Sequence, residues 1–393
     1  MRKNRIAAAG MLAAAGVALL GVQPAGADTT GPIDLGTLPG GTESRAVDIS
    51  ETGVVVGEAT TAAGETHAVR WGVDHAISQL GTLPGSTWST AVDVDDTGAV
   101  IVGVAELSGQ RRPVRWDATG EITALQLLPG GVRGEVAEVN ASGVAVGHSS
   151  AADGRTHAVK WSADGTVTDL GFLPGGTYTS VGQSVTDRAS SINDAGVVVG
   201  AVYTPDAKIH AVRWDADGTI SELAPPAAGR AWANLVNDAG DVVGSFQPGT
   251  APTEAVRWTG TGASALSTAG RTYYDLVGLN ESGVVVGNAV VSRWRYLALS
   301  WDAAGQLTEL PPLAGDVSSV AVDVTASGSV VGNSESAGET DRAVRWTGGA
   351  IQELGAPAGS TSTSVVAAND GGAVVGYTVL PGFHAHAVLW PTS

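Results

Sequence analysis

The sequence predicts an all-β protein: an eight-bladed β-propeller made of four-stranded repeats of about 45 residues. Three observations predict this fold. A Trp recurs at a nearly constant interval, each interval holds short runs of Val, Ile and Leu between turn residues, and the composition is rich in Gly and poor in charge. With 55 Gly among 393 residues and only 15% charged residues, turn-rich β structure is favoured over helices.

The repeat is marked by the Trp that ends each copy of a short motif, first seen as THAVRW at residues 66–71. Consecutive markers lie 43 to 53 residues apart, so eight copies fill residues 28–393 as a single domain. The marker residues are Trp71, Trp116, Trp161, Trp214, Trp258, Trp301, Trp346 and Trp390.

Each copy contains four short β runs in a constant order. A run such as AVDIS (46–50) is followed by a Gly turn, a VVVG run, a loop of variable sequence, the Trp run, a second turn and an ITDLG-like run. The first turn carries a polar residue three positions before Gly, as in NDAG at 193–196. That polar side chain can bond the backbone just ahead, and Gly accepts the positive φ that closes a hairpin.

The two ends of the repeated region predict how the ring closes. PIDLGTL at 32–38 is a lone strand of the fourth type, and HAVLW at 386–390 is a strand of the third type with no fourth strand after it. The first strand can therefore complete the last blade and remove an open edge. An open solenoid is the alternative, but it would need capping segments, and we find none in the sequence.

Residues 1–27 have the features of a secretory signal peptide: a basic start, an apolar stretch and an Ala-Gly-Ala end, with cleavage expected after about Ala27. The mature protein is therefore expected to be secreted, and no other segment is long and apolar enough to insert in a membrane. Removal of the signal peptide takes the formal net charge from -18 to -21. Such a negative surface disfavours nucleic acid and anionic membranes as partners. Because Cys is absent, the stability of the protein must come from a hydrophobic core and not from disulfides. We expect the mature protein to be a monomer.

The combination of N-D-x-G-x-V-V-G, H-A-V-x-W and D-L-G-x-L-P-G-G resembles the HAF family of bacterial extracellular repeats, and it covers residues 33–390. The chain departs from that family by placing Val where Phe is common, for example at Val69 and Val159. The resemblance implies export and a repeat scaffold, and it implies no particular activity.

Histidines four positions before the marker Trp might suggest a repeated site. His67, His157, His210 and His386 share this position, but other copies place Arg, Glu or Leu there. Equivalent positions in different blades are also far apart around a ring, so convergence on zinc or a catalytic centre is not expected. We interpret these histidines as structural residues at the rim of the blades.

Other charged positions also favour structural roles. The residue before the marker Trp is Arg or Lys in six copies, and we expect it to pair with strand acids such as Asp48, Asp93, Glu138 and Asp323. Acidic turns such as DADG at 215–218 lack the full ligand set of a calcium loop. No H-E-x-x-H, G-x-S-x-G or P-loop motif is present, so we predict neither a metal nor a cofactor.

The repeats differ most on one side of the expected ring. The loops between blades and the loops after VVVG should project from the same face, here called the variable face, and the Gly turns from the opposite hairpin face. Aromatic and Arg side chains on variable loops of a rigid scaffold can bind a ligand; alternatively, these rings cap the ends of the blade cores. The candidate ligand-binding residues are Trp88, Arg133, Tyr178, Arg230, Trp232, Tyr273 and Trp294.

These observations favour a secreted, non-enzymatic binding module whose ligand on the variable face is a carbohydrate, a cell-envelope component or a protein. Two alternatives stay open. One is an extracellular hydrolase or lyase with a site near the propeller axis, because a propeller can assemble an active site from several blades without any linear motif. The other is a scaffold that binds no small ligand.

Overall fold

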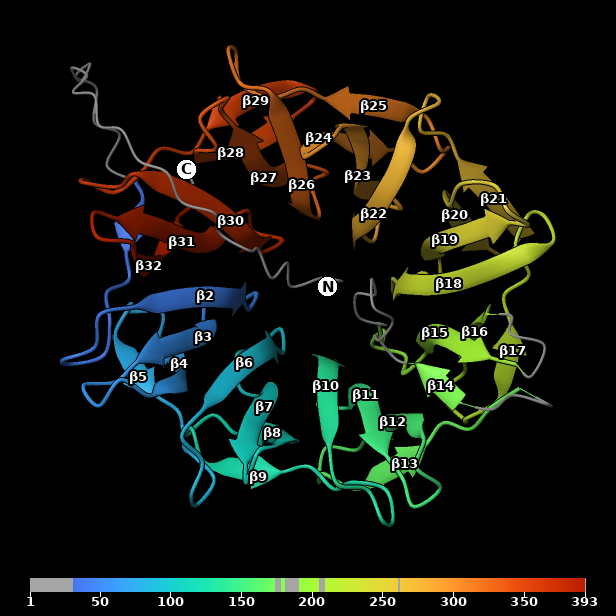
Figure 1. Cartoon of the computed structure of the whole chain (residues 1–393), viewed down its shortest axis with the longest axis horizontal. Coiled ribbons are helices and arrows are strands. Elements are labelled where there is room, and N and C mark those ends of the chain that lie inside the picture. The colour runs from blue at the N-terminus through green and yellow to red at the C-terminus, as the bar shows by residue number, and fades with distance from the viewer. Residues whose placement is uncertain (1–30, 174–177, 181–190, 205–208, 261, 393) are drawn as a thin grey trace.

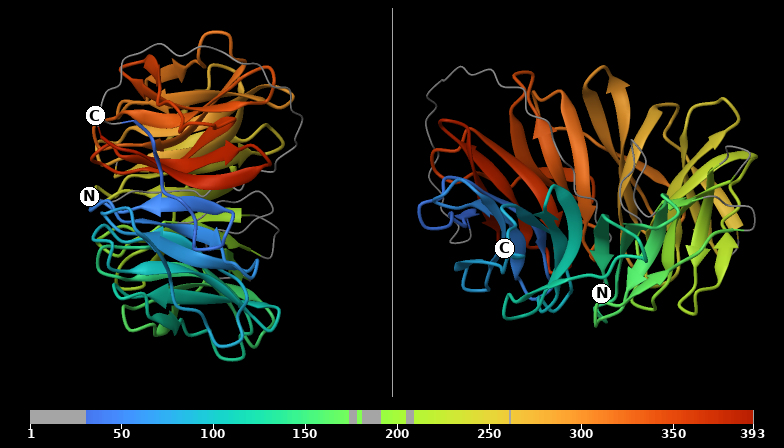
Figure 2. Two further views of the ribbon diagram at one scale, coloured as in Figure 1. Left: turned by 90° about the vertical axis from the view of Figure 1, so that its left-hand side faces the viewer. Right: turned by 60° about the horizontal axis from the view of Figure 1, so that its bottom comes forward.

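The computed structural model describes residues 31–173, 178–180, 191–204, 209–260 and 262–392, so the predicted signal peptide lies outside the described residues. Eight four-stranded antiparallel sheets stand around a common axis (Figure 1). The side views show the blades packed side by side into a ring, with loops projecting from its two faces (Figure 2). The predicted all-β eight-bladed propeller is confirmed.

In blades 1 to 7 the four strands follow the order of the sequence from the axis outwards, and in blade 8 the first strand of the chain, β1, takes the outermost place. We number the blades from the one that begins with β2. The innermost strands are β2 (Ser44–Ile49), β6 (Ser89–Val94), β10 (Gly134–Val139), β14 (Tyr178–Ser180), β18 (Gly229–Val236), β22 (Thr272–Leu279), β26 (Ser318–Val324) and β30 (Ser362–Ala368). The second strands are β3 (Val55–Thr60), β7 (Ile101–Leu107), β11 (Ala145–Ser150), β15 (Val198–Tyr203), β19 (Val242–Pro248), β23 (Val285–Ser292), β27 (Val330–Glu335) and β31 (Val374–Leu380).

The outer half of each blade contains the marker Trp and a short edge strand. The third strands are β4 (Thr66–Trp71), β8 (Gln110–Trp116), β12 (Thr156–Trp161), β16 (Ile209–Trp214), β20 (Glu254–Thr259), β24 (Arg295–Trp301), β28 (Asp341–Thr347) and β32 (His384–Trp390). The outermost strands are β5 (Ile77–Gln79), β9 (Ile122–Ala124), β13 (Val167–Asp169), β17 (Ile220–Glu222), β21 (Gly262–Leu266), β25 (Leu307–Leu310), β29 (Ala350–Glu353) and β1 (Ile33–Asp34).

The ring closes through the first strand, as the sequence predicts. β1 pairs antiparallel with β32, with Ile33 opposite Leu389 and Asp34 opposite Val388. Leu35 and Leu38, which follow β1, are buried in a cluster that also contains Trp71 of blade 1 and residues of blade 8. One short segment therefore joins the last blade to the first.

The Gly of the VVVG run allows a close approach between the two inner strands. A Cβ atom on Gly57 would lie 2.0 Å from the carbonyl oxygen of Arg45, and one on Gly103 would lie 2.1 Å from that of Thr90. The register of the inner strand shifts at the same place, between Ala46 and Asp48 in blade 1. The glycine is thus required by a bulge in the inner strand.

Asn residues at the first turn connect neighbouring blades as well as closing their own hairpin. Asn193 Oδ1 accepts the N–H of Val197 at 2.9 Å, as the turn chemistry predicts. Its Nδ2 donates to the carbonyl oxygen of Asn237 in the next blade at 3.0 Å. The same blade-to-blade bond is made by Asn140, Asn237, Asn280 and Asn369.

The marker Trp residues pack the space between blades. Eight hydrophobic clusters of described residues each combine side chains of adjacent blades around one such Trp. Trp116, for example, is completely buried, and its Nε1 donates to the carbonyl oxygen of Gly81 at 2.8 Å. The equivalent bond to the connector before the blade is made by Trp71, Trp161, Trp258, Trp301, Trp346 and Trp390.

Candidate functional site

Three of the repeated histidines pair with an acid of the outermost strand of their blade, whereas His67 Nε2 lies 3.3 Å from Glu65, which directly precedes its own strand. His210 Nδ1 lies 2.7 Å from Glu222 Oε1, and His386 Nδ1 lies 2.9 Å from Asp34 Oδ2. Arg342 replaces His in blade 7 and lies 3.7 Å from Glu353 at the same place. These contacts hold the outermost strand to the third strand, which supports the structural interpretation.

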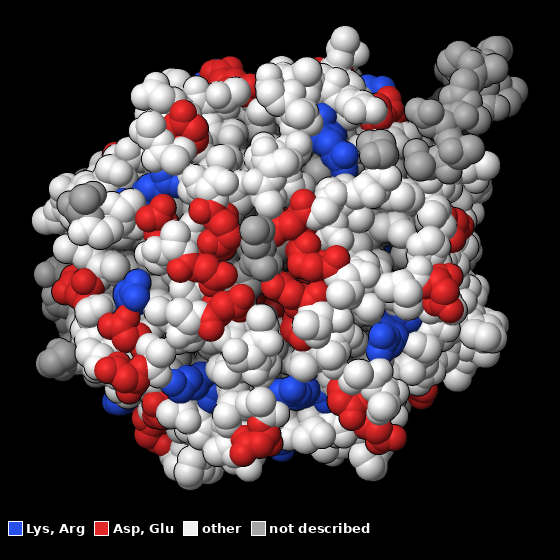
Figure 3. Space-filling model, turned by 180° about the vertical axis from the view of Figure 1, so that it is seen from behind, with Lys and Arg blue, Asp and Glu red and all other residues white. Residues whose placement is uncertain are grey.

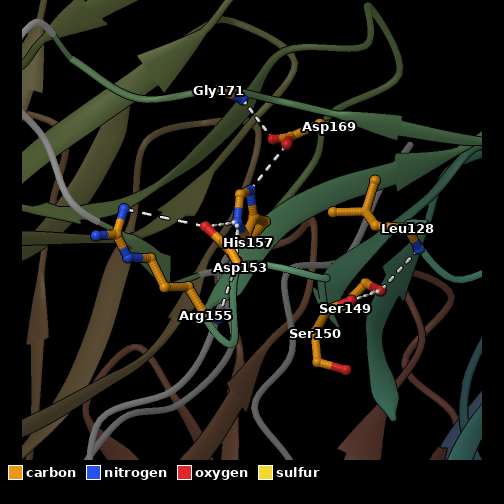
Figure 4. Close-up of polar contacts among 8 residues, drawn as sticks. All are labelled: Leu128, Ser149, Ser150, Asp153, Arg155, His157, Asp169 and Gly171. Atoms are coloured by element: carbon orange, nitrogen blue, oxygen red, sulfur yellow. Dashed lines mark hydrogen bonds and ion pairs between the residues drawn. The ribbon is translucent and has the colours of Figure 1, made fainter. Parts of the chain in front are cut away.

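His157 is engaged on both sides of its ring (Figure 4). Its Nδ1 lies 2.8 Å from Asp169 and its Nε2 lies 3.2 Å from Asp153. Ser149 is opposite His157 in the strand register, but its hydroxyl accepts the Leu128 N–H and donates to a backbone carbonyl. The group is therefore a hydrogen-bonded support for the blade and does not form a nucleophile–base pair.

The cations before the marker Trp do not pair with the strand acids, and that prediction is wrong. Arg70 donates to the carbonyl oxygen of Ala118 at 2.6 Å and Arg115 to that of Gly143 at 2.9 Å, both in the following blade. Lys160 makes an equivalent bond to Ala216. The carbonyls of the neighbouring turn lie within reach, so these side chains serve as links between blades.

The strand acids cap the inner strand of the next blade instead. Asp93 Oδ2 accepts the Val139 N–H at 2.7 Å, and Glu138 Oε2 accepts the Ile192 N–H at 3.0 Å. Asp48 and Asp323 make the same kind of bond. A bulged inner strand leaves N–H groups that a carboxylate can satisfy, and charge-assisted bonds of this kind are strong.

A ring of acidic residues on the hairpin face was missed by the sequence analysis. The residue directly after the polar turn position is acidic in six of the eight copies, which is the signal that could have revealed it. Acidic side chains gather around the centre of the face seen in Figure 3. The members are Glu51, Asp96, Asp194, Asp238, Glu281 and Asp370.

Backbone contacts explain how these like charges are accommodated. Asp238 Oδ1 accepts the Asp194 N–H at 2.8 Å, and Glu281 in turn accepts the Asp238 N–H. Burial raises the pKa of Asp96, with further increases from the charges of Asp194 and Glu51. Burial likewise raises the pKa of Glu281. The ring thus joins blades, and its electrostatic field is negative at the axis of the hairpin face.

The variable face brings Trp88 together with charged side chains from two blades. The Arg111 guanidinium lies 5.9 Å from the centre of the Trp88 ring, and Arg111 Nη1 lies 2.8 Å from Glu135 Oε1 of blade 3. Arg133 is exposed two residues before Glu135, and the buried His148 is opposite Glu135 in the strand register. We call these five residues the Trp88 patch.

The electrostatics of the Trp88 patch are set by its arginines and Glu135. Burial lowers the pKa of His148, and Arg133 lowers it further, whereas Glu135 opposes the change. His148 is therefore neutral at neutral pH. Neither of its ring nitrogens is hydrogen-bonded to another residue in the described part of the chain. The acid Glu106 is opposite Arg111 across β7 and β8, so the patch holds mixed charges with exposed arginines.

The other candidate residues are distributed around the ring. Arg230 is exposed and Trp232 is half-buried, both on β18 of blade 5. Trp294 is 73% exposed at the tip of the β23–β24 hairpin of blade 6, with the Arg293 guanidinium 5.8 Å from its ring centre. Tyr178 and Tyr273 belong to β14 and β22, but their side chains lie outside the described part of the structure. Among the candidates whose side chains the structure describes, Trp88 and Arg133 are the two that belong to the Trp88 patch.

Arg111, Glu135 and His148 were not predicted from the sequence. No periodic signal marks them, because Arg111 and Glu135 lie in different blades and meet only when these blades pack. Across the described residues, no group of three His, Asp or Glu side chains is arranged to hold a metal ion. The same residues include no helix that is long and apolar enough to cross a membrane.

Two acids face each other on the variable side of blade 7. Glu335 is opposite Asp341 in the register of β27 and β28, and Ser364 of blade 8 donates to Asp341 Oδ2 at 3.2 Å. Burial, and then the charge of Glu335, raise the pKa of Asp341 from 3.8 to about 6, while the Ser364 bond opposes this rise. At neutral pH Asp341 is therefore a carboxylate in an unfavourable environment.

The substitution Asp341→Asn is expected to stabilise the protein above pH 6. As pH rises from about 4 to about 6, the unfolded chain loses the Asp341 proton before the folded chain does, so stability falls in this window and the cost persists above it. The pKa difference corresponds to at most about 3 kcal/mol, and Asn can still accept the Ser364 bond. Melting temperatures of both proteins from pH 4 to 8 test this.

Glu335→Gln is the matched control for this experiment. It removes the second cause of the raised pKa, so the window in which stability falls should move to lower pH without disappearing. Parallel melting curves for Asp341→Asn and the unchanged protein across the whole pH range would show that Asp341 is not the responsible group.

Comparison with solved structures supports the fold. The β-propeller domain of the Trilobed protease from Pyrococcus furiosus has a TM-score of 0.51 and 13% identity, covering 80% of this chain and 98% of that one. Oligogalacturonate lyase from Vibrio parahaemolyticus has a TM-score of 0.51 and 9% identity, and the match covers 75% of this chain and 87% of the lyase chain. A puromycin hydrolase S511A mutant has a TM-score of 0.53 and 14% identity, and the match covers 89% of this chain and 58% of the hydrolase chain.

At these identities the likeness shows the propeller fold alone. The distant structural neighbours include proteases and lyases, and no specific function follows from them. The Pyrococcus domain is described as having an open velcro topology, whereas β1 pairs with β32 here. The sequence matches no known family model and no curated protein, so the resemblance to the HAF family stays a prediction.

Proposed function

We propose that the protein is a secreted, non-enzymatic binding module that holds a carbohydrate ligand on its variable face at the Trp88 patch. The observation that carries the proposal is the arrangement of Arg111, which contacts the Trp88 ring and an acid of the next blade. An aromatic ring with ordered polar groups beside it can stack on the apolar face of a sugar and bond its hydroxyls. A cell-envelope glycan and a glycosylated protein would both present such units.

Preorganisation supports this assignment. Arg111 is restrained by Trp88 and Glu135, so little side-chain entropy is lost when a ligand meets it. By contrast, the cations that precede the marker Trp, such as Arg70 and Arg115, are committed to carbonyl groups between blades.

The substitution Trp88→Ala is expected to weaken binding at least tenfold, because stacking on an aromatic ring contributes about 1.4 kcal/mol or more. A glycan array would first identify a bound saccharide, and isothermal titration would then give the affinities of the two proteins. Thermal unfolding should confirm that the variant keeps its fold.

Val73→Ala is the matched control, because Val73 is exposed in the turn between β4 and β5 on the hairpin face. It should leave the affinity within twofold of the unchanged protein. Equal capture by Trp88→Ala and the unchanged protein would remove the Trp88 patch as the binding site.

A second candidate function, hydrolysis or elimination, is favoured by one observation. The pair formed by Asp341 and Glu335 contains one acid whose pKa is raised to about 6, the range in which a carboxyl group can act as a general acid near neutral pH. Incubation of array-positive glycans with the protein and with Asp341→Asn distinguishes the two functions. Product formation that is lost in the variant would favour catalysis, whereas intact glycans would favour binding alone.

A further inference from the structure

We propose that the ligand is an anionic polysaccharide that spans the variable face and contacts Trp88 on blade 2 and Trp294 on blade 6. This inference rests on the proposed function and names the class and length of its ligand. Its first support is that both Trp rings have an Arg guanidinium within 6 Å of their centre, from β8 in the case of Arg111 and from the preceding residue in the case of Arg293. Blades 2 and 6 are four positions apart in a ring of eight, so these two contacts lie on opposite sides of the axis (Figure 1).

The tip of the β23–β24 hairpin presents the Trp294 ring to solvent, where it is 73% exposed. Trp294 has a φ of 64°, in the left-handed region that disfavours residues with a Cβ atom. The equivalent hairpins of blades 1, 2 and 3 use Gly64, Gly109 and Gly154 for a positive φ. The hairpins of blades 7 and 8 also place non-glycine residues, Glu339 and Phe383, at a positive φ, so what distinguishes Trp294 is a ring that is 73% exposed and has an Arg guanidinium beside it.

The charge around Trp294 favours an anionic ligand. Arg293 and Arg295 flank it and are exposed, and residues 285–301 contain no Asp or Glu, so the acid that interacts with Arg295 is Glu335 of the next blade. At the other contact, the Arg111 guanidinium lies 5.9 Å from the centre of the Trp88 ring, and Arg111 and Arg133 are both exposed. The acidic ring lies on the opposite, hairpin face, so an anionic chain on the variable face avoids most of the negative field at the axis.

Two separated contacts on one rigid scaffold also predict the length of the ligand. Once one contact binds a long chain, the second contact forms intramolecularly, so affinity rises steeply when the chain is long enough to reach both. A short fragment can occupy only one contact at a time. The ligand is therefore a polymer, and the affinity for it should exceed the affinity for its repeating unit.

Titration calorimetry with alginate fragments of defined length tests this inference, with dextran fragments of matched length as uncharged probes. Long alginate should bind at least tenfold more tightly than a tetramer, and binding should weaken as salt is added. Trp294→Ala should abolish the gain with length while changing tetramer binding at the Trp88 patch by less than twofold. Arg293→Gln should reduce the same gain.

Phe383→Ala is the matched control, because Phe383 is also an exposed aromatic at a hairpin tip with positive φ, on blade 8 and without a flanking Arg. It should retain the gain with length. A gain that survives Trp294→Ala, or dextran that binds as tightly as alginate, would overturn the inference while leaving the proposed function intact. Tetramer binding that is unaffected by Trp88→Ala would instead contradict the proposed function.

Discussion

A chain that lacks residues 32–38 is expected to lose on the order of 5 kcal/mol or more of folding free energy, which is comparable with the whole stability of many domains. The deletion removes the outermost strand of blade 8 together with the buried Leu35 and Leu38. It also removes the carbonyl that accepts the Trp71 Nε1–H and the Asp34 carboxylate beside His386. The deletion would therefore remove the strand pairing that closes the ring, here called the seam, and would expose the hydrophobic core between blades 8 and 1.

Thermal and denaturant unfolding of the deleted chain measure this effect, and a chain that begins at Gly31 is the control. The control keeps the seam and should match the parent protein. The deleted chain should unfold at a lower temperature and aggregate, because β32 would become an unpaired edge. Equal melting temperatures for the two chains would contradict closure by β1.

The substitution Trp116→Ala is expected to cost about 3–5 kcal/mol, the usual range for removing a large buried aromatic side chain. Trp116 is fully buried between blades 1 and 2, and its indole N–H donates a hydrogen bond to the carbonyl oxygen of Gly81. Trp116→Phe separates the two contributions. It keeps most of the packing and leaves that carbonyl without its Nε1 donor, which should cost about 1–3 kcal/mol.

Trp214 provides an internal control for the hydrogen bond. It is equally buried, but its Nε1 has no hydrogen-bond partner among the described residues. Trp214→Phe therefore lacks the penalty of a broken bond and should be less destabilising than Trp116→Phe, as measured by chemical unfolding. Equal losses for the two Phe variants would mean that the bonds to the connectors contribute little.

The architecture could be predicted from the sequence because every blade repeats the same local signals. The marker Trp, the turn Gly and the lone strand at 32–38 each have a local reason that periodicity exposes. The contacts between blades could not be predicted in the same way. A repeat gives the position of Arg70 within its blade, but which group of the next blade it meets depends on the angle at which the blades pack.

The candidate site was predicted in part for the same reason. Trp88 and Arg133 stand out because their positions vary between repeats, whereas Arg111 and Glu135 become relevant only through contacts across two blades. The acidic ring was missed for a different reason. Its residues fit ordinary turn chemistry, so Asp194 or Asp238 raises no question until the six equivalent positions are compared.

The pairing of β1 with β32 also determines the order of folding. The bond between Asp34 and His386 joins residues that are 352 positions apart, so the pairing of these strands has a very long loop to close and is expected to form last. Blades 1 to 7 consist of strands that are consecutive in sequence and can form as the chain becomes available. During synthesis and folding we therefore expect an open arc in which β32 lacks its partner strand, and this arc is the stage most exposed to intermolecular strand pairing.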